Sequence, residues 1–411
     1  MARSFRAVVQ QYSLPLIAGV VAAVVWANVA HDSYHELLHW SPFGSGSQYS
    51  LHFLVNDVFM ALFFGIAAGE ITESCLPGGD LNPPKKAINP LLGTLGGVLG
   101  PVGVYFLWVG ITGDSSIRNG WGIPTATDIA IAWLVARIAF GAKHPAVSFL
   151  LLLAVADDGI GLGIIAVFYP DPAHQVQPLY LLIVVGAMGV AYMMRRRMVR
   201  QFGWYVIGPG AASWLGLYLT GVHPALALVP IVPMLPSAGF DYGLFNEAER
   251  EMRDPLNQFE RFFRFPVDLG LFAFGIANAG VAFTSIGNAT WGVLLGLVVG
   301  KTAGIFTFSM VGHALGFKLP DGMNAKTLLL AALTAALGLT VALFVAGVAF
   351  TDPTIQGAAK MGALLSVGVV PLVLLGSRVL GVRRRTAGDR GDPESEPAYA
   401  SGDGQRHVAS L

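Results

Sequence analysis

The chain has 411 residues, of which 54% are hydrophobic and only 12% are charged. Soluble domains carry about 25% charged residues, so this chain has too little charge to cover a soluble globule of its size. Its 25 basic and 25 acidic residues balance, which argues against a basic surface for nucleic acid. The single cysteine, Cys75, excludes an internal disulfide and a cysteine-cluster metal site. The composition predicts a polytopic membrane protein.

Apolar runs of membrane-spanning length follow one another along the chain. A spanning helix needs roughly 20 mostly apolar residues. The runs predict an all-α fold of about twelve transmembrane helices, at residues 14–30, 51–71, 88–112, 121–140, 146–168, 177–194, 202–220, 222–236, 266–285, 289–312, 326–350 and 357–380. They form one transmembrane domain, 14–380, preceded by a cytoplasmic N-terminal segment, 1–13. The tail, 381–411, is rich in Arg, Gly, Ser and Asp and is expected to be disordered and cytoplasmic.

Basic residues test the orientation, because cytoplasmic loops carry an excess of Lys and Arg. With both termini in the cytoplasm, twenty-two of the 25 basic residues fall in cytoplasmic segments, and Arg118 alone lies clearly outside. An odd number of spans would scramble this sorting. The distribution therefore predicts the orientation and an even count. The longest internal loop, 237–265, alternates Phe with Glu and Arg, which predicts an amphipathic stretch at the cytoplasmic surface.

Two adjacent carboxylates, Asp157 and Asp158, lie in the middle of the fifth span. A charge in the bilayer core is expensive, so it is a functional hypothesis by default. Adjacent helix positions point about 100° apart, so these two acids cannot share one proton face to face. We expect one to face a water-filled cavity and the other a neighbouring helix. The alternative is a structural ion pair plus a snorkelling acid.

The fourth span contains Pro124, which removes a backbone donor, flanked by Thr125 and Thr127, which can bond freed backbone groups. This pattern predicts an interrupted helix, and opened backbone at membrane depth is tolerated only inside protein or along a cavity. Asp128 beside the break either compensates the positive ends of half-helices or ligates a cation directly. An ordinary proline kink is the alternative.

A second interruption is predicted in the eleventh span, where Gly338 and Thr340 fall in mid-span. Spans 3–5 and 10–12 would then be corresponding triplets of opposite topology. Paired discontinuous helices in two halves indicate the binding site of a secondary transporter.

Lys301 lies inside the tenth span, where a buried lysine must pair or lose its proton. Its natural partner is Asp157 or Asp158. A pair that breaks when a cation arrives would be a proton-coupled switch, and a permanent structural salt bridge is the alternative.

Other polar residues fall nearer the ends of spans. Asp57 in the second span is either an outer-vestibule acid or a helix cap, and Asp268 is expected at a solvated helix end. His223 and His313 are expected to be satisfied polar residues, and Glu70 lies near a cytoplasmic helix end.

From Asn56 to Phe350 the chain resembles the NhaA-type Na+/H+ antiporters. The matching motifs are Asn56-Asp57, Gly120-Trp121-Gly-Ile-Pro124-x-Ala126-Thr127-Asp128, Ala156-Asp157-Asp158-Gly159, Ala277-Asn278-Ala279-Gly280 and Gly300-Lys301-x-x-Gly304. The resemblance implies a fold of inverted-topology repeats with two interrupted, crossing helices. It also implies exchange of cytoplasmic Na+ (or Li+) for external H+ across a bacterial inner membrane, for pH and sodium homeostasis. No cofactor is implied beyond the transported ions, and the loop 31–50 would join two copies in a homodimer.

The resemblance also implies roles for the charged residues. Asp158 would be the principal Na+ ligand and proton carrier, with Asp157 beside it. Lys301 would pair with Asp157 and exchange that pairing with cation occupancy. Asp128 and Thr127 would lie at the crossing of the interrupted helices.

Asp57 would line the outer side.

Two segments depart from the family. The basic–acidic run that follows the position of Glu70 in the family reads Glu70-Ile-Thr-Glu73-Ser here, and the histidines of the segment around Glu260 are missing. Because the family's pH sensing is tied to both regions, Glu70 and Glu260 are candidates for pH regulation, and whether the family's pH response carries over stays open.

An intramembrane aspartyl protease also needs two bilayer aspartates, in Tyr-Asp and Gly-x-Gly-Asp contexts on separate helices. Neither context occurs in this sequence, so we expect a transporter and not an enzyme. A proton-coupled exchanger of K+ or an organic anion on the same scaffold stays open as the alternative function.

Overall fold

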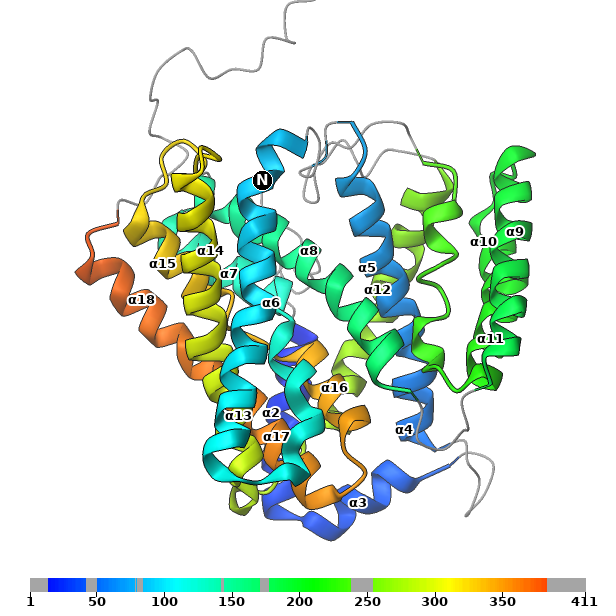
Figure 1. Cartoon of the computed structure of the whole chain (residues 1–411). Coiled ribbons are helices and arrows are strands. Elements are labelled where there is room, and N and C mark those ends of the chain that lie inside the picture. Colours follow the sequence, from blue (N-terminus) through cyan, green and yellow to red (C-terminus); the bar gives the residue numbers. More distant parts are fainter. Residues whose placement is uncertain are drawn as a thin grey trace, which may run out of the picture.

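The computed structural model describes residues 14–41, 50–77, 79, 84–141, 144–170, 177–237 and 254–382. Every regular element within these ranges is a helix, which confirms the all-helical class (Figure 1). Seven of the described helices are long and apolar enough to cross a membrane, or eight if one bent pair counts as a span. The predictions for the N-terminal segment 1–13 and for the tail from residue 383 lie outside the described residues.

The first half of the chain ends with the helix that carries the two adjacent carboxylates. Its elements are α2 (Leu14–Val29), α3 (His31–His39), α4 (Leu51–Phe53), the π-helical η1 (Leu54–Phe59), α5 (Met60–Ser74), α6 (Pro84–Thr112), the 3-10 segment η2 (Ser115–Thr125), α7 (Ile129–Phe140) and α8 (Pro145–Phe168).

The second half begins with helices at the edge of the molecule and returns to its centre (Figure 1). Its helices are α9 (Leu181–Arg196), α10 (Phe202–Tyr205), η4 (Val206–Gly210), α11 (Ala211–Thr220), α12 (Pro255–Ala279), α13 (Asn288–Leu295), η9 (Gly296–Lys301), α14 (Thr302–Ala314), α15 (Ala325–Thr334), α16 (Thr340–Ala349), α17 (Pro353–Leu365) and α18 (Val369–Val379). Short 3-10 turns join some of them, at η3 (Pro178–Tyr180), η5 (Pro224–Leu226), η6 (Val232–Met234), η8 (Phe283–Ser285) and η10 (Ser366–Gly368).

Helices α6 and α14 run side by side (Figure 1). Their backbones touch at glycines: a Cβ at Gly96 would meet the carbonyl of Gly304, and a Cβ at Gly100 would meet that of Gly300. Small residues let membrane helices approach in this way. The contact sets the position of Lys301, which lies between these two glycines of the second helix.

Substituting Gly96 by Ala is therefore expected to destabilise the protein. The new methyl group meets backbone that cannot move aside, and overpacking of this kind costs about 1–3 kcal/mol. Gly103→Ala is the matched control on the same helix, because a Cβ there has nothing within 4 Å. Thermal unfolding of the two purified variants in detergent measures the difference. Equal melting temperatures would contradict the close helix contact.

Two predicted helices differ from the structure. The stretch 222–236 is not a regular helix but a series of turns that includes η5 and η6. Its four prolines remove backbone donors that a helix needs, although the residues are as apolar as those of a span. The ninth helix begins at Pro255 and not near residue 266, because Asp254 caps it by accepting a hydrogen bond from the Asn257 N–H (3.3 Å). Asp268 therefore lies midway along α12, and the prediction of a solvated helix end is wrong.

Candidate functional site

Both predicted interruptions are present, and they contact each other. The fourth span bends by 57° between η2 and α7, and the eleventh is broken between α15 and α16. The hydroxyl of Thr127 donates to the carbonyl of Ala335 (3.0 Å), and the N–H of Asp128 donates to that of Leu337 (2.7 Å). Gly338 allows this approach, since a Cβ there would lie 2.9 Å from the carbonyl of Ala126. The first opened segment thus supplies hydrogen-bond donors to backbone carbonyls of the second, inside the protein.

Asp128 lies between two helix N-termini. It caps α7, where its Oδ1 accepts from the Ile131 N–H (3.1 Å), and its Oδ2 accepts from the N–H (3.3 Å) and the hydroxyl (3.0 Å) of Thr340 at the start of α16. The side chain is buried, with 3% of the residue exposed. A carboxylate in this position faces the positive ends of two helix dipoles.

Two tyrosines hold the segment before the first break. Tyr105 donates to the carbonyl of Ile117 (2.8 Å), while Tyr169 donates to that of Asn119 (2.7 Å) and accepts from the Gly122 N–H (2.8 Å). A Cβ at Gly122 would lie 2.6 Å from the hydroxyl of Tyr169, so only glycine fits there. Sequence reasoning missed both tyrosines, because nothing in their local pattern separates them from other apolar positions.

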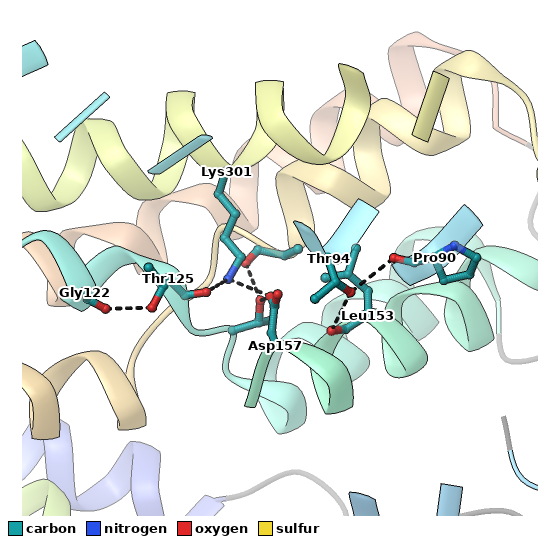
Figure 2. Close-up of polar contacts among 9 residues, drawn as sticks. Pro90, Thr94, Gly122, Thr125, Leu153, Asp157 and Lys301 are labelled. Carbon is teal, nitrogen blue, oxygen red and sulfur yellow. Dashed lines mark hydrogen bonds and ion pairs between the residues drawn. The ribbon is translucent and has the colours of Figure 1, made fainter. Parts of the chain in front are cut away.

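Lys301 pairs with Asp157, as Figure 2 shows. The Lys301 Nζ lies 2.8 Å from Asp157 Oδ2 and donates to the carbonyl of Thr125 (2.6 Å), just before the first break. The hydroxyl of Thr127 donates to the same Asp157 oxygen (2.9 Å). Lys301 and Asp157 are 0% and 1% exposed. Of the two partners left open by the sequence, the structure brings Asp157 to the lysine.

The hydroxyl of Thr94 joins α6 to α8 one turn before Asp157. It approaches the carbonyls of Pro90 (3.1 Å) and Leu153 (3.4 Å), as drawn in Figure 2. This contact, together with the glycine packing of α6 on α14, holds the acid and the lysine on their two helices at pairing distance.

Asp158 faces a different environment. It is 8% exposed, and within the described part of the chain its buried Oδ1 has no hydrogen-bond partner, which is also true of Asp157 Oδ1. The residue lines a narrow crevice that is too tight for a water-sized sphere, together with Phe64, Ala67, Leu162 and Val341. One of the two adjacent carboxylates, Asp157, is thus paired with a neighbouring helix, as expected. The water-filled cavity expected beside the other stays a prediction.

Asp57 lies inside the π-helical segment η1, so the helix-cap alternative is wrong. Its Oδ1 lies 3.9 Å from the Nδ1 of His223, whose ring packs edge-on against Phe344 at 4.9 Å between centroids. His223 also accepts from the Ala225 N–H (3.2 Å), and His313 accepts from the Leu319 N–H (3.2 Å). Both histidines are therefore bonded polar residues, as expected.

Next to Asp57, two asparagines connect η1 with α12. The amide of Asn278 donates to Asn56 Oδ1 (2.9 Å), and Asn56 in turn bonds the ring of His52 (2.9 Å). The sequence indicated both asparagines only as parts of family motifs, not as a bonded pair.

Glu70 and Glu260 lie on facing helices, α5 and α12. The carboxylate of Glu260 lies against Gly69, the neighbour of Glu70, and Arg264 on α12 interacts electrostatically with Glu70. The structure thus brings the two candidates together, and their part in pH regulation stays a prediction.

The chain matches the family model described as Na+/H+ antiporter 1 over residues 4–380. It is 58% identical to the Na(+)/H(+) antiporter NhaA of Geobacter metallireducens, over 91% of this chain and 97% of the relative. The corresponding protein of Geobacter sulfurreducens is 57% identical over the same shares, and that of Jannaschia sp. is 42% identical, again over 91% and 97%. The chain belongs to the Na+/H+ antiporter 1 family.

Proposed function

We propose that this multi-pass Na+/H+ antiporter exports cytoplasmic Na+ (or Li+) and takes up external H+ by binding the two ions in turn at Asp158. The observation that carries the proposal is the buried carboxylate oxygen of Asp158, which has no hydrogen-bond partner among the described residues and borders a crevice. A buried polar atom without a partner is costly, and binding of a cation or a proton removes that cost.

Competition at this carboxylate couples the two ions. Hard cations prefer oxygen ligands, which carboxylates, carbonyls and threonine hydroxyls supply. Ionised Asp158 binds Na+, and protonation releases it. The site opens to each side in turn as one group of helices rocks against the other, which is how transporters with inverted repeats work.

The Lys301–Asp157 pair acts as a switch in this scheme. An arriving cation competes with the ammonium group for Asp157. Lys301 keeps its hydrogen bond to the carbonyl of Thr125, so it stays in place when the pair opens. Re-pairing then accompanies cation release.

Asp128, in our proposal, compensates the helix ends and does not ligate the cation, because the hydrogen bonds to its carboxylate come from the starts of α7 and α16. Asp128→Asn should keep measurable exchange but lower the stability by about 1.5–3 kcal/mol, the usual worth of a hydrogen bond to a charged group. Detergent unfolding and the apparent KM for Na+ test this expectation. Unchanged stability with complete loss of Na+ binding would instead assign a direct ligand role.

The membrane topology is part of the proposal. Beyond the seven long helices and the bent pair, the described part of the chain has three shorter apolar helices, α2, α15 and α16. If α15 and α16 make one broken span, and residues 202–220 and the turns of 222–236 each cross, the total is twelve crossings, in inverted repeats and with both termini cytoplasmic. We place the protein in a bacterial inner membrane as a homodimer. The loop proposed to join the copies is described only in part, because 42–49 lie outside the described residues.

Proteoliposomes with an imposed proton gradient and a pH-sensitive dye test the function. Na+ or Li+ added outside should collapse the gradient, because either ion exchanges for lumenal H+, whereas K+ should not. Protein-free liposomes are the control. A response to K+ or to an organic anion, with none to Na+ and Li+, would favour the alternative exchanger and refute this proposal.

A further inference from the structure

A second buried lysine, Lys360, lies midway along α17 inside the span Pro353–Val379. It is 7% exposed, and among the described residues no acidic side chain pairs with it and no hydrogen bond holds its ammonium group. Lys301, by contrast, has a carboxylate and a carbonyl. An unpaired ammonium group inside the bilayer is expensive, so it is a functional hypothesis by default.

The helix that carries Lys360 is held firmly in place. The hydroxyl of Thr290 donates to the carbonyl of Ala358 (2.7 Å), and the side chain of Gln356 donates to the carbonyls of Gly347 (2.9 Å) and Phe350 (3.1 Å). Lys360 is seven residues from the first residue of α17, which places it about 10 Å along the helix axis from that end. The ammonium group is thus attached to a helix that hydrogen bonds hold in place, about two turns from the start of that helix.

Lys360 belongs to the polar groups on the side of the molecule where α3 and α4 lie. We define the outer polar cluster as His52, Asn56, Asp57, His223 and Asn278. Lys360 interacts electrostatically with His52 of this cluster. Helices α3, α4 and α17 lie toward the same end of the molecule (Figure 1), and the distribution of basic residues predicts that this end faces outward.

Edge-on aromatic contacts connect the outer polar cluster with the crevice of Asp158. Phe64, which lines the crevice, packs edge-on against Phe344 at 5.3 Å between centroids, and Phe344 packs edge-on against His223 at 4.9 Å. These contacts run from the crevice through Phe344 to His223, a member of the outer polar cluster.

We propose that Lys360 is a specificity-determining positive charge on the outer route, where it opposes Na+ entry from outside and favours Na+ release to the outside. The inference rests on the proposed exchange at Asp158. At the effective dielectric constant of about 20 that suits protein sites, a unit charge about 10 Å from a bound cation changes the affinity for that cation by about tenfold. The charge changes the affinity for Na+ that arrives from outside, and it does not change the equilibrium set by the two ion gradients.

The test uses the full-length protein in uniformly oriented proteoliposomes, with Na+ varied on one face at a time and exchange followed by a pH-sensitive dye. Lys360→Met removes the charge at similar length, Lys360→Gln is a second neutral variant, and Lys360→Arg keeps the charge. Lys318→Met, an exposed lysine beyond the end of α14, is the matched control. Monodispersity and the melting temperature show that each variant is folded.

The expected result is an apparent KM for external Na+ about tenfold lower in Lys360→Met and Lys360→Gln. The KM for cytoplasmic Na+ should stay within about twofold, and Lys360→Arg and Lys318→Met should behave like the wild type. An unchanged external KM, an equal shift on both faces, or an equal shift in Lys360→Arg overturns the inference. An inactive wild type in the same vesicles would instead refute the proposed exchange, so the two failures are distinguishable.

Discussion

Asp158→Asn is expected to reduce Na+-driven proton release from proteoliposomes to the level of protein-free vesicles. An amide has nearly the shape of the carboxylate, but it neither carries a proton nor offers a negative charge to a cation. Because the crevice and its apolar lining remain, the loss would come from the chemistry of one group and not from a change of packing. The dye assay with Na+ and Li+ measures it directly.

Asp352→Asn is the matched control for that substitution. Asp352 is exposed at the start of α17, where it accepts a hydrogen bond from the Thr354 N–H (2.8 Å), and asparagine caps helices about as well as aspartate. It should therefore keep both stability and exchange. Asp158→Asn should also keep a normal unfolding transition, because the carboxylate of Asp158 makes no hydrogen bond with the described residues. Wild-type exchange in Asp158→Asn would refute the single-site mechanism.

The interruptions could be predicted from sequence because their causes are local. Pro124 with its neighbouring threonines, and Gly338 with Thr340, disfavour continuous helix whatever surrounds them. The apolar run at 222–236 led to a wrong prediction for a related reason. Hydropathy reports burial, and a segment with four prolines can be buried as turns.

The partner of Lys301 could not be predicted from the residues alone. Asp157 and Asp158 are neighbours in sequence on α8, and only the packing of that helix in the fold decides which of them reaches the lysine. Tyr105 and Tyr169 are a similar case, since each bonds backbone that is distant in the chain or across a turn. Lys360 falls within the predicted span 357–380, but its lack of a partner is a property of the fold.

Lys301→Met is expected to lower the free energy of unfolding by about 3–5 kcal/mol, the usual cost of leaving one member of a buried ion pair uncompensated. Asp157 would keep only the hydrogen bond from Thr127, and the carbonyl of Thr125 would lose its donor. Asp157→Asn leaves the buried ammonium group of Lys301 without its carboxylate partner, so a similar loss of stability is expected. Lys326→Met, at an exposed lysine, should change little. Unfolding of the purified variants in detergent measures these differences.

The double variant Asp157→Asn/Lys301→Met separates a switch from a permanent salt bridge. Removing both charges leaves no uncompensated ion, so its loss of stability should be much smaller than the sum of the two single losses. Additive losses would contradict the pairing. If the pair opens and closes during exchange, the double variant should regain stability but not normal Na+/H+ exchange. If the pair only holds the helices together, stability and exchange should return together, and the switch would be wrong.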